Sequence, residues 1–268
     1  MKLRLSLVAM AALAVAATAA YARPSSSPPT KTPGTLVVGF GDAAVGFAAG
    51  TNRGSEILNP RGYEVDIAKA IAKQLGIPKI KWIYTPWTKL FAPGRKTFDI
   101  SFQEATITAA RKRTVDFSAS YLNANQGVLI SKKAKKPTSL ADLRQMQTCA
   151  QVDTTGLGYI QTRLRPTRTP LVYQSTAAAF TAVQVGRCDA LVLDVPIVAL
   201  QKKSKPGAYG PVAGQIVTHE QYGAVFQKGS KLKPLVDRAI RKLTANGTIG
   251  RLQKRWFNFN FAKIPTLH

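Results

Sequence analysis

The amino-acid sequence predicts an α/β protein of two lobes, each built on a mostly parallel sheet flanked by helices. Strand-like segments alternate along the chain with segments of helical periodicity, an order typical of parallel sheets covered by helices. The chain has 268 residues. Without the leader described below, about 246 residues remain, which is enough for two lobes of ordinary size.

The first half of the chain is predicted to alternate three strands with two helices. Strands are expected at 35–40 (TLVVGF), at 79–84 (KIKWIY) and from Phe98 onward (FDISF), because their apolar or alternating patterns suit extended chain. In the segment 62–76 (GYEVDIAKAIAKQLG), apolar residues recur every four positions, lysines occupy another face and a glycine ends the pattern. This segment is predicted to be an amphipathic helix, and a shorter helix is expected from Trp87.

The second half repeats this alternation. The helix predicted at 175–186 (STAAAFTAVQVG) has a Ser or Thr cap and a terminal glycine. The other strands expected here are 126–131, 148–152, 171–173, 188–193 and 222–228, and the other helices are 139–146, about 156–165 and two between about 231 and 256.

The N-terminus resembles a secretory signal peptide. Lys2 and Arg4 precede an Ala/Leu/Val run that ends in Ala20-Tyr21-Ala22, so residues 1–22 are expected to be removed on export. A membrane-spanning helix is the weaker alternative, because the run is short and a basic stop-transfer patch does not follow it. The next segment, 23–33, is rich in Pro and Ser and is predicted to be disordered. The remaining protein is expected to be periplasmic or extracellular.

The charge is strongly positive. The chain has 38 Lys and Arg against 13 Asp and Glu; without Lys2 and Arg4 the excess is still +23. Nucleic acid is a common partner of such a surface, but export argues against it, and the basic runs 131–136 and 201–205 contain no aromatic residues for base stacking. We therefore expect no nucleic-acid partner. These runs are expected to be solvated turns, and an anionic membrane surface is the more credible electrostatic partner.

The two cysteines are candidates for a disulfide. Cys149 (in QTCAQV) and Cys188 (in GRCDALV) both lie near the starts of predicted strands. Neighbouring parallel strands would bring them within bonding distance, and the alternative is a pair of small buried thiols. The only histidines are His219 and His268, so no Cys/His cluster for a metal is expected, and no cofactor is predicted.

Polar residues follow the carboxyl ends of several predicted strands, where ligands bind in open sheets of this type. Thr106 and Arg111 follow the strand that begins at Phe98, and Asp194 ends the strand DALVLD. A planar guanidinium can hold a carboxylate by two parallel hydrogen bonds, and a carboxylate can receive an ammonium group. Taken singly, Arg111 is also compatible with an exposed surface residue and Asp194 with a helix cap.

Four stretches resemble, in order and spacing, the amino-acid-binding proteins of ABC importers (solute-binding protein family 3). The resemblance covers roughly residues 35 to 257. The stretches that carry it are GYEVDIAKAIAKQLG, FDISFQEATITAARKRTVDFSASY, GRCDALVLD and YGAVFQKGSKLKPLVDRAIRKLTANGTIGRLQKRWF.

This resemblance implies a periplasmic-binding-protein clamshell that closes about a two-strand hinge. Lobe 1 is expected at 34–124 plus 220–262, and lobe 2 at 125–219. The implied function is capture of an α-amino acid in the cleft by a monomeric receptor, followed by delivery to the membrane subunits of an ABC importer.

The resemblance also implies roles for individual residues. Arg111 is expected to bind the ligand's α-carboxylate, with the hydroxyl of Thr106 assisting it. Asp194 is expected to bind the α-ammonium. The family's Gly-Thr-Thr turn, whose backbone amide joins the carboxylate site, matches Asp153-Thr154-Thr155, so Thr155 is carried over as a ligand-binding residue.

Three departures from the family pattern blur the identity of the ligand. Glu104 stands where the family often has Gly or Ser; it either adds a second carboxylate to the pocket, which would favour a cationic ligand, or points away. Asp153 replaces the first Gly of Gly-Thr-Thr. Ala44 occupies the place of the family's stacking aromatic, so Phe47 or Trp87 is the candidate for the apolar wall, with a plain core position as the alternative for each.

A different class of function remains an alternative. The scaffold also resembles periplasmic cyclohexadienyl dehydratases, in which a pocket carboxylic acid assists loss of carboxylate and hydroxide, and Glu104 is the candidate for that acid. The sequence contains no recognisable Ser-His-Asp arrangement or phosphate loop. We therefore expect a binding protein and not an enzyme.

Overall fold

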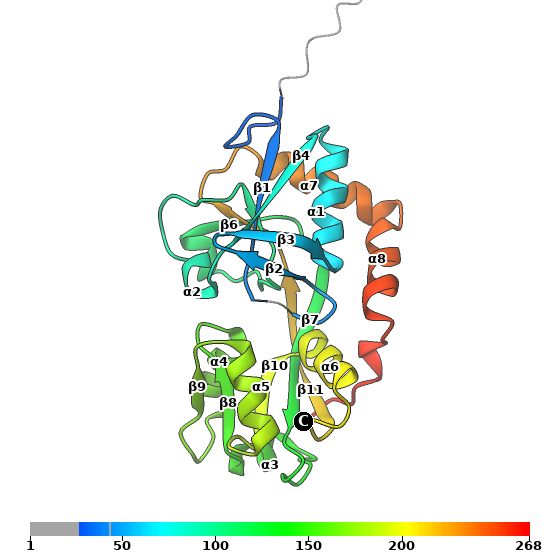
Figure 1. The fold of residues 1–268 in the computed structure, drawn as a ribbon. Coiled ribbons are helices and arrows are strands. Elements are labelled where there is room, and N and C mark those ends of the chain that lie inside the picture. Colours follow the sequence, from blue (N-terminus) through cyan, green and yellow to red (C-terminus); the bar gives the residue numbers. More distant parts are fainter. Residues whose placement is uncertain (1–26, 43) are drawn as a thin grey trace, which may run out of the picture.

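The computed structural model describes residues 27–42 and 44–268, which form two lobes joined by long strands (Figure 1). The predicted signal peptide, 1–22, and the first part of the Pro/Ser-rich segment lie outside the described residues. Within the described ranges, no helix is long and apolar enough to cross a membrane. Ordered contacts begin before the first strand, because the Lys31 amide donates to Asp99 Oδ1 over 2.7 Å.

Lobe 1 is built on a seven-stranded sheet with the order β2-β3-β4-β1-β5-β12-β6. Its strands are β1 (Thr35–Phe40), β2 (Ala49–Arg53), β3 (Glu56–Arg61), β4 (Lys79–Tyr84), β5 (Ile100–Ser101), β6 (Val115–Phe117) and β12 (Val225–Gln227). Its helices are α1 (Tyr63–Gln74), α2 (Trp87–Leu90), the 3-10 turn η1 (Arg111–Arg113), α7 (Lys233–Ala245) and α8 (Thr248–Phe257). Helix α1 buries its apolar positions Ile67 and Ile71, as the four-residue spacing predicts.

Lobe 2 is built on a five-stranded sheet with the order β11-β7-β10-β8-β9. Its strands are β7 (Leu122–Ile130), β8 (Thr148–Gln151), β9 (Leu171–Tyr173), β10 (Ala190–Asp194) and β11 (Val212–Tyr222). Its helices are α3 (Leu140–Gln145), α4 (Thr155–Tyr159), the π-helical turn η2 (Ile160–Leu164), α5 (Thr176–Val185) and α6 (Val195–Ser204). Helix α5 has the predicted ends: Ser175 accepts a hydrogen bond from the Ala178 amide, and Gly186 has φ 77°.

The two-lobed α/β architecture is confirmed, but both sheets are mixed where mostly parallel sheets were predicted. Parallel pairing is confined to β4-β1-β5 and to β10-β8-β9, and all other neighbours are antiparallel. The hairpin β2-β3 folds back on itself, and the strands that pass between the lobes enter each sheet in reverse direction. Strand alternation along the sequence does not contain this information.

Two long strands cross between the lobes. β7 and β11 pair antiparallel, with Leu122 opposite Tyr222 at one end and Leu129 opposite Val212 at the other. A third segment also returns to lobe 2 after α8 (Figure 1): Thr266 forms a bridge with Gln215, and Leu267 is buried in the core of lobe 2. The C-terminal residues, which include the 3-10 turn η3 (Phe261–Lys263), therefore lie along the hinge strand β11.

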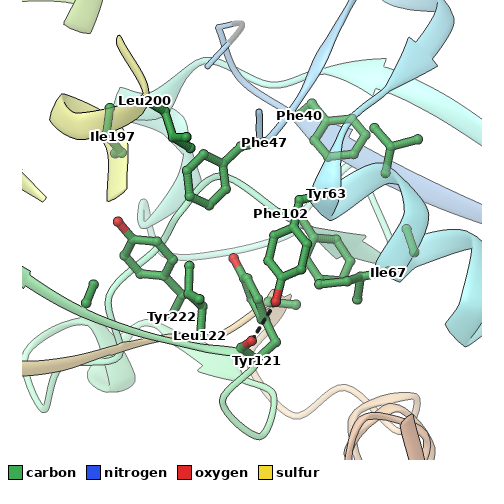
Figure 2. Close-up of a cluster of buried hydrophobic side chains, with 14 of the residues drawn as sticks. Phe40, Phe47, Tyr63, Ile67, Phe102, Tyr121, Leu122, Ile197, Leu200 and Tyr222 are labelled. Carbon is green, nitrogen blue, oxygen red and sulfur yellow. Dashed lines mark hydrogen bonds between the residues drawn. The ribbon is translucent and has the colours of Figure 1, made fainter. Parts of the chain in front are cut away.

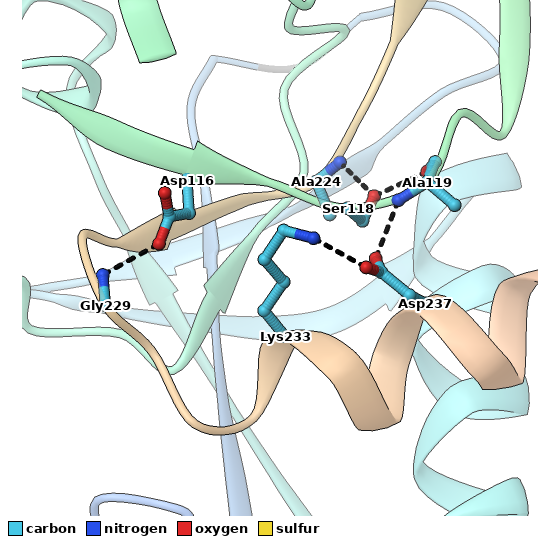
Figure 3. Close-up of polar contacts among 7 residues, drawn as sticks. All are labelled: Asp116, Ser118, Ala119, Ala224, Gly229, Lys233 and Asp237. Carbon is cyan, nitrogen blue, oxygen red and sulfur yellow. Dashed lines mark hydrogen bonds and ion pairs between the residues drawn. The ribbon is translucent and has the colours of Figure 1, made fainter. Parts of the chain in front are cut away.

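A polar cluster holds the roots of both crossing strands against lobe 1 (Figure 3). Asp237 of α7 accepts hydrogen bonds from the Ala119 amide, over 2.7 Å, and from Lys233 Nζ, over 2.6 Å. The neighbouring Ser118 hydroxyl accepts from the Ala224 amide over 2.9 Å. Because Ser118 and Ala224 lie just before β7 and just after β11, this cluster fixes the point from which the hinge strands leave lobe 1.

The predicted disulfide is confirmed. Strands β8 and β10 are parallel neighbours, with Leu191 opposite Cys149. A disulfide joins Cys149 to Cys188, with the two Cα atoms 6.0 Å apart. It fastens the start of β10 to β8 in the centre of lobe 2, on the strand that carries Asp194 to the cleft.

Candidate ligand-binding site

The cleft between the lobes contains a cavity of about 350 Å³ lined by both of them. Six of the seven candidate binding residues line it: Trp87, Glu104, Thr106, Arg111, Thr155 and Asp194. Four come from lobe 1 and two from lobe 2. The structure thus brings together residues that lie as much as 107 positions apart in the sequence.

The ends of strands position these side chains. Thr106 and Arg111 follow β5 in lobe 1, Asp194 is the last residue of β10, and Thr155 begins α4 directly after β8. Because the carboxyl ends of β5, β8 and β10 face the cleft, short loops suffice to place polar groups there, as expected for open α/β sheets.

Arg111 spans the cleft. Its guanidinium donates to the carbonyl of Thr106 in its own lobe, over 2.8 Å, and to the carbonyl of Asp153 in lobe 2, over 2.9 Å. The guanidinium carbon also lies 4.0 Å from the ring centroid of Phe91. Burial lowers the pKa of Arg111 to about 10, although nearby carboxylates oppose the shift. Arg111 therefore remains a cation at neutral pH.

Asp194 is 6% exposed and lies among other polar groups. The Tyr222 hydroxyl donates to its Oδ2 over 2.6 Å, and Gln126 Nε2 donates to its Oδ1. Burial, and then the charge of Glu220, raise the pKa of Asp194 to about 7. The carboxyl group is thus poised between its two protonation states near neutral pH, and an adjacent cation would favour the ionised form.

Glu220 belongs to this site and was not predicted from the sequence. Its Oε2 accepts hydrogen bonds from the hydroxyls of Thr106, over 2.9 Å, and Thr155, over 2.7 Å. Both carboxylate oxygens also lie within 3.2 Å of Gln126 Nε2. Glu220 is in the hinge strand β11, two residues before the stretch YGAVFQK that carries part of the resemblance, but no local pattern marks it as a site residue.

Glu104 lines the cavity, and a second carboxyl group contacts its backbone. Oε1 of the buried Glu64 accepts hydrogen bonds from the Glu104 amide, over 2.9 Å, and from the Tyr121 hydroxyl, while its Oε2 has no hydrogen-bond partner among the described residues. Burial and the charge of Glu64 raise the pKa of Glu104 well above its ordinary value; burial raises the pKa of Glu64 to about 7. Burial and mutual repulsion therefore favour the protonated form of these two carboxyl groups.

Of the two candidates for the apolar wall, Trp87 lies at the cavity and Phe47 does not. Trp87 lines the cavity, and its indole N–H donates across the cleft to the carbonyl of Val152 over 3.1 Å. Phe47 is fully buried in the core instead (Figure 2). Its ring packs against Tyr63, Tyr222 and Phe257 with centroids 4.9 to 6.2 Å away, and it does not line the cavity.

The cavity continues beyond the charged groups along lobe 2. Its lining there comes from α5 and α6 and from the turn after α6, and it includes Phe180, Gln184, Ile197, Lys205 and Tyr209. This part is mixed in character, with apolar and aromatic walls and a lysine at the exposed end. It has the chemistry to receive a side chain once the charged end of a ligand is held.

These features define a class of protein: two lobes that close on a small ligand, with the cation Arg111 from one lobe and the carboxyl group of Asp194 from the other lining a shared cavity. Hydrogen bonds from Arg111 and Trp87 to lobe 2 carbonyls show that the lobes are closed on each other. Within the described ranges, no group of three or more His, Cys, Asp or Glu side chains is arranged for a metal ion.

Comparison with known proteins identifies the family. The model for bacterial extracellular solute-binding proteins, family 3, matches residues 36–259, and the chain belongs to that family. The chain is 32% identical over 200 residues to the glutamine-binding protein GlnH of an ABC transporter of Bacillus subtilis (strain 168), covering 73% of this chain and 72% of the relative.

Two solved structures are also similar. An ancestral arginine-binding protein bound to glutamine superposes with a TM-score of 0.74 at 27% identity, covering 85% of this chain and 100% of the other. An ancestral amino-acid-binding protein described as a precursor of cyclohexadienyl dehydratase superposes with a TM-score of 0.71 at 32% identity, covering 84% of this chain and 95% of the other.

Proposed function

We propose that this protein is exported, captures an α-amino acid between its lobes and delivers it to the membrane subunits of an ABC importer. The observation that carries the proposal is that Arg111 and Asp194, on opposite lobes, line the same closed cavity. Family membership and the named ligands of the relatives support the same ligand class.

The two charged ends of an amino acid suit the two ends of this site. Arg111 binds the α-carboxylate through donors that its two backbone contacts leave free, since a guanidinium has five. Asp194 binds the α-ammonium in its ionised form. Each charge-assisted hydrogen bond contributes about 1.5 to 3 kcal/mol in such a site. A ligand that touches both lobes stabilises the closed state by its differential affinity for that state.

The charges around the cavity favour a neutral or cationic ligand side chain over an acidic one. Asp42, Glu104 and Asp194 line the cavity together with only two cations, Arg111 and Lys205, and Glu220 adds a further carboxylate behind them. An additional carboxylate on the ligand would face repulsion from these groups.

A dehydratase-like reaction is the second candidate function, because Glu104 presents a carboxyl group of raised pKa to the cavity. In that case Glu104 donates a proton to the hydroxyl that leaves the substrate. The similarity to the precursor of cyclohexadienyl dehydratase adds support for the scaffold only.

One pair of measurements separates the candidates. Thermal-shift screening of the purified mature protein against the twenty amino acids is expected to reveal stabilisation by at least one of them. Turnover assays with prephenate and arogenate are expected to show no reaction. Turnover that is lost in Glu104→Gln would establish the enzyme instead, and a protein that no amino acid stabilises would contradict the transport proposal.

A further inference from the structure

The hydroxyls expected to assist a ligand carboxylate already bind a carboxylate of the protein. Thr106 in lobe 1 and Thr155 in lobe 2 both donate to one oxygen atom, Oε2 of Glu220, over 2.9 and 2.7 Å. A hydroxyl has a single proton to donate. Neither threonine can therefore donate to Glu220 and to a ligand carboxylate at the same time.

A local irregularity in the hinge strand directs Glu220 into the site. The pairing of β11 with β7 shifts register between Ile216 and Glu220, and His219 adopts φ 53°. The amides of Thr218 and His219 both donate to Asn125 Oδ1 over 3.1 Å, which holds this bulge in place. Because a one-residue change of register moves a side chain to the opposite face of a strand, the bulge sets the direction of Glu220.

The charge of Glu220 is compensated mainly by neutral donors, although the nearby guanidinium of Arg111 attracts it. No Lys or Arg forms an ion pair with it among the described residues, and its hydrogen bonds come from two hydroxyls and the amide of Gln126. The same amide nitrogen also donates to Asp194. A carboxylate held this way contributes repulsion to any second carboxylate that approaches the same hydroxyls.

Space for an alternative position lies behind the hinge. Glu220 also lines a second cavity, of about 430 Å³, on that side of β11. The lining there includes the polar residues Asn123, Asn125, Gln215 and Gln221. Amide side chains of this kind can solvate a carboxylate that leaves the cleft.

We propose that Glu220 sets the affinity of this site, as a resident carboxylate that bridges the lobes through Thr106 and Thr155 and that the ligand's carboxylate must displace. This inference rests on the proposed function for the identity of the competing ligand. The bridge that Glu220 forms between Thr106 and Thr155 does not depend on the proposed function. Glu220 thus weakens the binding of the ligand, and it holds the two lobes partly closed before the ligand binds.

The test compares Glu220→Gln and Glu220→Ala with two controls, Glu56→Gln and Val217→Ala. Glu56→Gln makes the same charge change on a partly exposed residue of β3, and Val217→Ala truncates an exposed residue of β11 that lines neither cavity. Isothermal titration uses the amino acid that stabilises the wild type most in the screen. Glu220→Ala is expected to bind it roughly tenfold more tightly, the equivalent of about one charge-assisted hydrogen bond. Glu220→Gln should show a smaller gain, and the controls none.

Small-angle X-ray scattering without added amino acid tests the bridge directly. Glu220→Ala is expected to have a larger radius of gyration than the wild type and the controls. Unchanged or weaker amino-acid binding in both Glu220 variants would overturn the competition and assign Glu220 to the ammonium side of the site. An unchanged radius of gyration would overturn the bridge. If no amino acid binds the wild type, the proposed function fails, and the scattering comparison still decides whether Glu220 joins the lobes.

Discussion

The two ends of the cavity are stabilised in opposite ways. Arg111, from lobe 1, is oriented by two backbone carbonyls and packs on the ring of Phe91. Asp194, from lobe 2, is buried and accepts hydrogen bonds from Tyr222 and Gln126, and burial together with the charge of Glu220 raises its pKa. The guanidinium of Arg111 is thus fixed in position and charged at neutral pH. The carboxyl group of Asp194 is ionised only in part at neutral pH, because its pKa is about 7.

This difference indicates that the two ends of the site contribute to ligand affinity in different ways. The guanidinium of Arg111 is pre-organised by its backbone contacts, so its remaining donors meet a ligand carboxylate without rearrangement. The hydroxyls of Thr106 and Thr155 must first release Glu220. The cation-binding end holds an excess of negative charge, so a ligand ammonium group relieves repulsion when it arrives. Affinity should depend on Arg111 at every pH, and on Asp194 only as far as that residue is ionised.

Replacement of Arg111 should have the largest effect. In Arg111→Met, the α-carboxylate loses its only cationic partner while the methionine retains contact with Phe91, so amino-acid affinity is expected to fall more than about 100-fold, as when one partner of a buried charge pair is removed. Isothermal titration measures the change. Arg113→Met, which removes an exposed arginine from the same turn η1, is the control and should bind as the wild type does. Near-normal affinity in Arg111→Met would refute the assignment of the carboxylate end.

The dependence on pH should separate the two ends. Because the pKa of Asp194 is about 7 and the ammonium requires the ionised form, affinity is expected to fall by up to about tenfold per pH unit below 7. Binding in this range should be accompanied by release of a proton, which titrations in buffers of different ionisation enthalpy detect.

The free energy of unfolding without ligand should change in the opposite sense. The raised pKa means that the folded state binds more protons than the unfolded state between about pH 4 and 7, so Asp194 makes the protein more stable as pH falls through this range.

Asp194→Asn provides the control for this prediction. The variant should bind weakly, with an affinity that varies little between pH 5 and 7. If the affinity of Asp194→Asn still depends on pH, Asp194 is not the titrating group. The dependence would then be assigned to Glu64 and Glu104, whose pKa values are also raised.

Trp87→Phe should have the smallest effect of the three. The phenyl ring keeps an aromatic wall on the cavity but loses the hydrogen bond to the Val152 carbonyl that helps to close the lobes. A loss of one neutral hydrogen bond predicts about three- to tenfold weaker binding, measured by the same titration. Trp82→Phe, at the stacked pair with Phe40 in lobe 1, should leave the affinity unchanged, and an equal loss in both variants would contradict a role for Trp87 in closure.

Local sequence patterns anticipated much of the fold and part of the site. The spacing of Ile67 and Ile71 predicted the buried face of α1, and the parallel neighbours β8 and β10 brought Cys149 and Cys188 together as expected. The wall candidates Phe47 and Trp87 could not be separated, because an aromatic residue after a strand suits a core and a cavity equally well. Only the packing of Phe47 against Tyr63 and Phe257 resolves the choice.

The sequence by itself indicated the helices, the strands that alternate with them, the disulfide and the residues that follow the strand ends, because each depends on neighbouring residues or on a recognisable motif. The strands β2, β3, β6 and β11 were not predicted. The tertiary structure alone decided the mixed strand directions, the contact between Glu64 and the Glu104 amide, and the contact of Glu220 with the hydroxyls of Thr106 and Thr155. These features depend on the register of strands and on the closure of two lobes, which bring together residues 40 to 114 positions apart. Contacts between residues so far apart in the sequence depend on the whole fold, so they cannot be predicted from any single segment of the chain.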